Sequence, residues 1–149
     1  MPADSEVQLP HTFRPIGVRL AIYVLGSVLA LASFGIWFAF PPEIRAQFTA
    51  SELLTLLVLG LMFYAAGWAL SRSRVVARES GLTVVNGFRA RHFEWNQVLA
   101  VTLRSGSPWA MLDLSDGTTV AAMGIQGSDG GRAQRQVRQL RALVQRNTR

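Results

Sequence analysis

Residues 20–40 read LAIYVLGSVLALASFGIWFAF, and residues 53–71 read LLTLLVLGLMFYAAGWALS. These stretches, of 21 and 19 residues, contain no charged side chain. A helix rises about 1.5 Å per residue, so 21 residues cover roughly 31 Å, which is close to the thickness of the hydrocarbon core of a bilayer. We therefore predict a hairpin of two membrane-spanning helices, at 20–40 and 53–71, joined by an external loop at 41–52.

Two other interpretations of the apolar stretches carry less weight. A soluble chain of 149 residues could hardly bury two uncharged helices of this length on all sides. The Ala-Leu-Ala at 30–32 imitates the cleavage site of a secretory signal peptide, but the apolar run continues to Phe40, where a signal peptide would turn polar. The stretch at 20–40 is therefore expected to remain as an uncleaved helix.

The arginines beside the two stretches set the expected orientation. Arg14 and Arg19 precede the first stretch, and a cluster of arginines follows the second, whereas the intervening loop has a single arginine. Cytoplasmic loops carry the excess of basic residues in membrane proteins. We expect a multi-pass protein of the inner (plasma) membrane, with the tail at 1–19 and the C-terminal part at 72–149 both in the cytoplasm.

Charge is unevenly distributed along the chain. All fifteen basic residues are arginine, and twelve of them lie within 72–149, where only five acidic residues oppose them. This part carries a net charge of +7, which suggests an anionic neighbour such as the cytoplasmic leaflet or nucleic acid. The use of arginine without lysine is typical of a GC-rich genome and suggests an actinobacterial source.

The C-terminal part has the pattern of a small antiparallel sheet. Short runs of apolar and β-branched residues are separated by turn residues, and Asn86-Gly87 is a strong hairpin signal. We predict six strands, at 75–78, 82–86, 88–95, 98–104, 109–114 and 118–123. The chain then ends in an amphipathic helix, for which Ser128 or Asp129 is the expected cap. One helix face collects the apolar side chains that would pack on the sheet: Ala133, Val137, Leu140 and Val144.

Residues 75–145 resemble the short bacterial PH-like domain of actinobacterial membrane proteins, the family that includes low-molecular-weight protein antigen 6. The resemblance is carried by segments in a fixed order: Gly81-Leu82, residues 93–98 (FEWNQV), 108–110 (PWA), 112–117 (LDLSDG) and 123–126 (MGIQ). It implies a fold in which the transmembrane hairpin is followed by an α+β PH-like domain, a small antiparallel β-barrel capped by a C-terminal helix. A full PH domain has seven strands, so either one strand is hidden near Ile125-Gln126 or the barrel is incomplete.

Catalysis has little support in the sequence. The two histidines are far apart, there is no cysteine, and no P-loop or nucleophile-elbow pattern occurs. We therefore expect no enzyme activity, no metal and no cofactor. The apolar stretches hold no ionisable side chain, which argues against a transporter or channel acting alone.

Two binding functions remain. The first is an accessory or scaffolding subunit that docks another membrane protein or complex, with Trp95 and Trp109 as aromatic anchors unless they fill the core. The second is recognition of membrane lipids with anionic headgroups, or simple fixing of topology, by basic residues: Arg72, Arg74, Arg78, Arg135 and Arg138. No nucleic-acid motif is present, so no nucleic-acid partner is expected, and homo-oligomerisation is left open.

Overall fold

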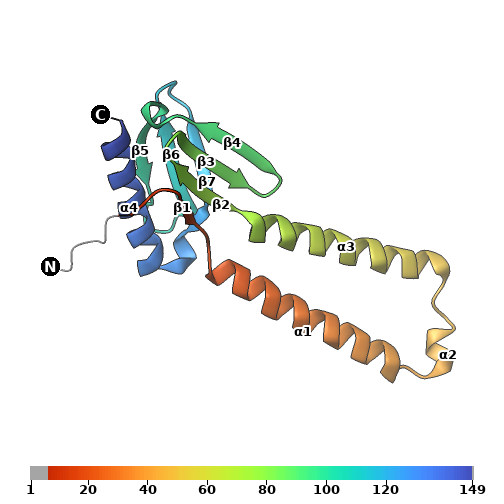
Figure 1. Cartoon of the computed structure of the whole chain (residues 1–149). Coiled ribbons are helices and arrows are strands. Elements are labelled where there is room, and N and C mark those ends of the chain that lie inside the picture. Colours follow the sequence, from red (N-terminus) through yellow and green to blue (C-terminus); the bar gives the residue numbers. More distant parts are fainter. Residues whose placement is uncertain (1–6, 149) are drawn as a thin grey trace.

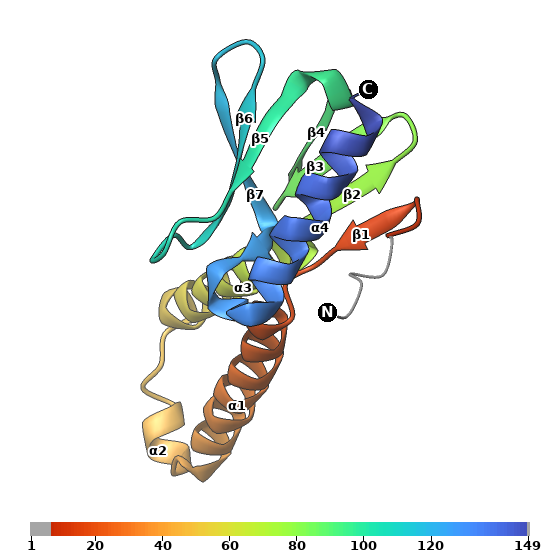
Figure 2. The same ribbon diagram turned by 90° about the vertical axis from the view of Figure 1, so that its left-hand side faces the viewer.

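The structure is a computed structural model that describes residues 7–148 (Figure 1). Two long helices, α1 (Gly17–Ala39) and α3 (Ala50–Arg72), project from a small domain and are joined by the short helix α2 (Pro42–Arg45). Both long helices are exposed along their apolar lengths and are long and apolar enough to cross a membrane. They lie together at the domain and diverge toward α2, as both views show (Figures 1 and 2).

The contact between the long helices is confined to the end near the domain. A Cβ on Gly67 of α3 would lie 3.1 Å from the Ile22 side chain of α1. A Cβ on Gly26, Gly35 or Gly60 would meet nothing within 4 Å. The surface of the long helices is therefore open at these three glycines.

The domain consists of seven strands in two antiparallel sheets, followed by helix α4 (Gly131–Asn147). The first sheet has the order β1 (His11–Phe13), β2 (Arg74–Arg78), β3 (Gly81–Asn86) and β4 (Arg89–Phe93). The second sheet has the order β5 (Val98–Thr102), β6 (Trp109–Leu114) and β7 (Thr119–Gln126). Figure 2 shows α4 lying across the sheets. This arrangement is the predicted PH-like fold after a helical hairpin.

The seventh strand comes from an unexpected part of the chain. β1 precedes the first long helix and pairs with β2, with Phe13 opposite Val75 and His11 opposite Ala77. Both sequence-based alternatives were therefore wrong: β7 itself runs through Gln126, and the first sheet is completed from the N-terminal tail. The whole helical hairpin is thus an insertion in the connection between β1 and β2.

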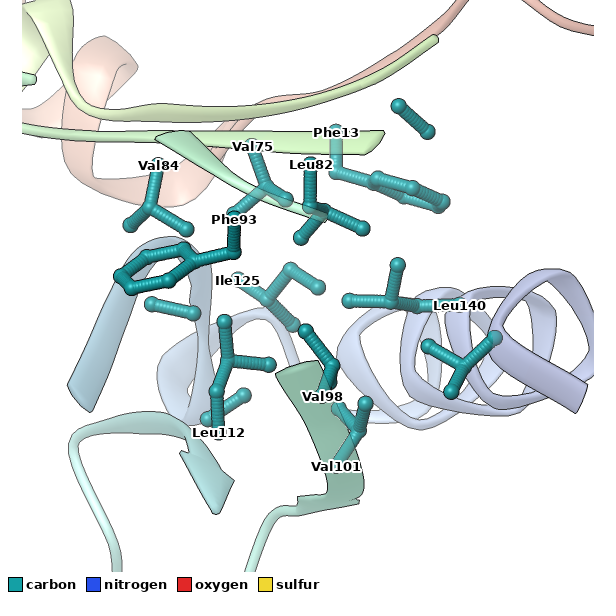
Figure 3. Packing of buried hydrophobic residues seen from close by; sticks show 14 of the residues in the cluster. Phe13, Val75, Leu82, Val84, Phe93, Val98, Val101, Leu112, Ile125 and Leu140 are labelled. Carbon is teal, nitrogen blue, oxygen red and sulfur yellow. The ribbon is translucent and has the colours of Figure 1, made fainter. Parts of the chain in front are cut away.

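The core lies between the two sheets and is closed by α4 (Figure 3). Phe13, Leu82, Leu112, Ile125 and Leu140 come from five different elements, and all five are fully buried. The predicted inner face of the last helix is confirmed by its buried side chains: Ala133, Val137, Leu140 and Val144. Because Phe13 is fully buried in this core, β1 is part of the domain and not a loose tail.

A polar side chain and a glycine join the two sheets where they cross. The Asn86 amide donates to the carbonyl of Ala121 at 2.6 Å and accepts from the backbone amide of Met123 at 3.0 Å, so β3 is tied to β7. Gly124 of β7 lies so close to β2 that a Cβ would be 2.6 Å from the backbone of Arg74. Any larger residue at position 124 would push the sheets apart.

Asp129 has a different role from the one expected. The N-cap of α4 is Gly130, and no side chain caps that helix. The Asp129 carboxylate instead accepts from the backbone amides of Ile16 at 3.0 Å and Gly17 at 2.9 Å, at the start of α1. The side chain satisfies two of the amides that a helix leaves unpaired at its N-terminus. It therefore fixes the first long helix to the domain.

Several strand boundaries also differ from the prediction: the strand expected at 98–104 ends at Thr102, and the strand expected at 118–123 runs from Thr119 to Gln126. The predicted strand 88–95 ends at Phe93, and residues Trp95–Gln97 form a short 3-10 helix, η1, stabilised by a reciprocal pair of hydrogen bonds between Glu94 and Gln97. The central residues of the hairpin between β3 and β4 are Gly87 and Phe88. Glycine supplies the positive φ of +60° that the first of these positions requires.

Candidate functional site

The edge of the second sheet borders a shallow groove beside the C-terminal helix. β5 pairs with β6 on one side only, and within residues 7–148 no strand covers its other side. A groove of about 290 Å³ lies between this edge and α4. Its lining comes from these two elements: Leu99, Ala100, Val101, Thr102, Arg141, Val144 and Gln145. An open strand edge beside an apolar groove is a surface on which an extended peptide could pair.

Leu99 and Arg141 define the character of this groove. Leu99 sits at a β-bulge, is 66% exposed, and points away from the core that its neighbours Val98 and Val101 fill. The Arg141 guanidinium donates from Nε to the carbonyl of Val101 at 2.6 Å, so this carbonyl faces α4. The groove therefore offers one large apolar side chain and a strand edge that Arg141 occupies in part.

The arginines of the predicted lipid site lie in separate parts of the surface. Arg72 ends α3 and Arg74 begins β2, so both lie where the long helices meet the domain. Arg78 is at the other end of β2, about 13 Å further along the strand. Arg135 and Arg138 are exposed on α4, on the opposite side of the domain from α3 (Figure 1). The five arginines therefore fall into three groups: Arg72 with Arg74, Arg78 alone, and Arg135 with Arg138, which are three residues apart on α4.

The two tryptophans of the predicted partner surface have different environments. Trp95 is 6% exposed, and its indole Nε1 donates to the carbonyls of Arg78 at 3.0 Å and Glu79 at 3.1 Å. This side chain fills the core and ties η1 to the end of β2. Trp109 is half-buried at the start of β6, opposite Gln126. Of the two tryptophans, Trp109 is therefore the more accessible to a partner.

Comparison with known proteins agrees with this geometry. The model of a family described as Bacterial PH domain matches residues 72–143. Residues 72–143 thus resemble a bacterial PH domain. Uncharacterized proteins of Mycobacterium bovis and Mycobacterium tuberculosis are each 27% identical to this chain over 97% of its length and 92% of their own. The similarity to these relatives therefore includes β1 and both long helices. No solved structure matches the chain.

The histidine and carboxylate side chains of the domain form no cluster in the described residues. In the described part of the chain, no group of three or more His, Asp or Glu side chains is placed to hold a metal ion. His92 is exposed on β4, with its Nδ1 3.1 Å from the hydroxyl of Thr83. The hydroxyl and then the backbone amide of Thr118 donate to Asp116 and lower the pKa of that carboxyl. Both of these polar pairs stabilise strands and turns.

Two exposed apolar side chains of the PH domain were missed by sequence reasoning. Leu99 is 66% exposed in the groove, and Phe88 is 68% exposed at the tip of the β3–β4 hairpin. Leu99 was assigned to a strand without regard to its face. Phe88 was placed inside a strand, although it follows Asn86-Gly87 directly. The one-residue shift of the turn is what places Phe88 at the tip.

Proposed function

We propose that this protein is a non-catalytic membrane adaptor, in which the helical hairpin holds the PH domain at the cytoplasmic face of the plasma membrane and the domain docks a partner membrane protein. The groove between β5 and α4 is the observation that carries the docking function. It combines an unpaired strand edge with the exposed Leu99. An extended segment of the partner would pair with β5 and cover Leu99, which is the general mode of strand addition to a sheet edge.

The pairing of β1 with β2 supports the proposed topology. These strands flank the hairpin, so both ends of the hairpin must lie on the same side of any membrane that it crosses. Arg14 and Arg19 stand at one of these ends and Arg72 and Arg74 at the other. Basic residues at both ends favour the cytoplasmic side.

The docking function is tested by charge substitution in the groove. The full chain is purified in mild detergent from its native membrane, as wild type and as Leu99→Glu, and the retained proteins are quantified. A buried apolar anchor at an interface is worth about 2 kcal/mol, so we expect Leu99→Glu to weaken partner retention about 30-fold. Ser115→Glu places the same charge on the exposed β6–β7 turn and should retain the partner.

Two results would reject a distinct partner in the groove. One is equal retention of every co-purifying protein by Leu99→Glu and Ser115→Glu. The other is recovery of the chain with only further copies of itself, which would make the groove a surface for self-association.

A second candidate function is recognition of anionic lipid. Arg72 and Arg74 favour it, because they lie together at the end of α3. Native mass spectrometry of the full chain should show less retained phosphatidylglycerol when both are changed to Gln than when Arg135 and Arg138 are. If both double variants retain the same amount of phosphatidylglycerol, the basic end of α3 is not a lipid site.

A further inference from the structure

The turn between β3 and β4 is fixed against the end of the second long helix. A Cβ on Gly87 would lie 3.4 Å from the Cβ of Ala69 in α3. The Gly87 backbone amide donates to the hydroxyl of Ser73 at 3.1 Å, and this hydroxyl donates in turn to the carbonyl of Ala69 at 3.4 Å. Ala69 is one turn before the last residue of α3, Arg72. The tip of the hairpin therefore reaches back about 4.5 Å along the helix from its end.

This level of α3 has the composition of a membrane interface. Trp68 is 48% exposed and stacks on Tyr64 with ring centroids 6.4 Å apart, and Arg72 follows one turn later. Tryptophan and tyrosine collect at the headgroup level of membranes, with arginine on the water side. A bilayer whose headgroups lie at Trp68 therefore also reaches the β3–β4 turn, which touches the neighbouring residue Ala69.

The turn presents an apolar tip and a basic flank. Phe88 is 68% exposed, which is unusual for a phenylalanine outside the long helices. The next residue, Arg89, is also exposed and lies across the strand pair from Asn86. β4 carries exposed side chains from Arg89 to His92, so the hairpin extends beyond the core. Figure 1 shows this hairpin pointing in the same direction as α3 leaves the domain.

We propose that the β3–β4 turn is a second membrane contact of the domain, in which Phe88 inserts into the headgroup region of the leaflet at the domain end of α3 and Arg89, with Arg72, binds the phosphates of anionic phospholipids. An aromatic side chain flanked by arginine suits a region that is apolar on one side and anionic on the other. The contact makes a third attachment point beside the ends of α1 and α3. It stops the domain from pivoting and fixes the direction in which the β5–α4 groove faces.

The contact is tested by measuring depth in the bilayer. The chain contains no cysteine, so a single nitroxide label can be placed at Phe88→Cys in the full chain, reconstituted in nanodiscs that contain phosphatidylglycerol. Ser80→Cys is the control, because it lies in the exposed turn at the opposite end of β3. We expect the label at 88 to be several-fold more accessible to oxygen than to a water-soluble nickel reagent, and the label at 80 to show the reverse. Equal accessibility at both positions would refute the insertion.

The role of Arg89 is tested in the same discs. Arg89→Gln should raise the water accessibility of the label at 88 several-fold in phosphatidylglycerol, and Arg78→Gln, at the far end of β2, should leave it unchanged. Equal effects of the two substitutions, or the same depth in discs of phosphatidylcholine alone, would refute the phosphate contact. The discs contain no partner protein, so these results do not depend on the docking proposal. They depend on the two long helices crossing a bilayer, and failure of the chain to enter discs would refute both.

Discussion

The strand ahead of the first long helix should stabilise a domain that begins some sixty residues later in the chain. Phe13 is completely buried among both sheets and α4. Truncation of a buried phenylalanine to alanine costs about 3–5 kcal/mol, from lost burial and from the cavity that remains. Domains of this size have a free energy of unfolding of about 5–15 kcal/mol, so Phe13→Ala should remove a large share of the total.

The assay is pulse proteolysis of the full chain in detergent at increasing urea concentration, with cleavage within the PH domain as the readout. With a urea dependence of about 2 kcal/mol per M, the loss lowers the unfolding midpoint by about 1.5–2.5 M. Phe88→Ala is the matched control, because it makes the same change at a side chain that is 68% exposed. It should cost less than about 0.5 kcal/mol. Midpoints for the two variants within about 0.3 M of each other would refute the assignment of β1 to the domain.

Three further predictions concern the connections described above. The register of β1 and β2 leaves room for a two-residue turn, so residues 7–14 can be joined to 74–148 through Asn-Gly. This joined chain should give a water-soluble folded domain with slow amide exchange in its strands. Residues 74–148 alone, which lack β1, should bind hydrophobic dyes. Asp129→Ala should cost about 0.5–2 kcal/mol and speed amide exchange in the first turn of α1 but not in α4; unchanged exchange there would contradict the cap. The pKa of the Asp116 carboxyl should lie below its ordinary value near 3.9, because the ionised form accepts hydrogen bonds from Thr118. The stabilisation of the turn by these hydrogen bonds is therefore lost only as the pH falls through the lowered pKa. Thr118→Val should move the pKa back up in an NMR titration, and an unmoved pKa would exclude the hydroxyl as its cause.

The long helices and most strands of the domain were predictable because their signals are local. An uncharged stretch of about 20 residues has few alternatives to a membrane helix, and turn signals such as Asn86-Gly87 mark the ends of strands within a few residues. The inner face of α4 followed from helical periodicity alone, and its side chains are buried as expected.

The missed features all depend on contacts between distant segments. β1 is three residues long, too short to show an alternating pattern, and its partner β2 lies beyond the entire hairpin. Asp129 precedes α4 in sequence and was therefore matched with the nearest helix, although its carboxylate binds amides more than a hundred residues away. No local sequence pattern indicates that β1 pairs with β2 or that Asp129 caps α1.

The candidate site was only partly visible for the same reason. Sequence patterns identify arginine and tryptophan as typical contact residues, but they do not tell which tryptophan the core takes up. The structure buries Trp95 and separates Arg78 from Arg72 by the length of β2. The exposed Leu99 and Phe88 depend on a bulge and on a turn shifted by one residue, which only the pairing of strands determines.

The position of the hairpin within the β1–β2 connection links the biosynthesis of the protein to its topology. β1 leaves the ribosome first, but its partner strand follows some sixty residues later, a delay of about 3–12 s at ordinary translation rates. During this interval β1 must remain unpaired on the side of the membrane on which β2 will be released. A molecule whose first helix entered the bilayer in the wrong direction would carry Phe13 to the opposite compartment and leave a hole in the domain. On the proposed membrane topology, completion of the fold thus discriminates between correctly and wrongly inserted molecules.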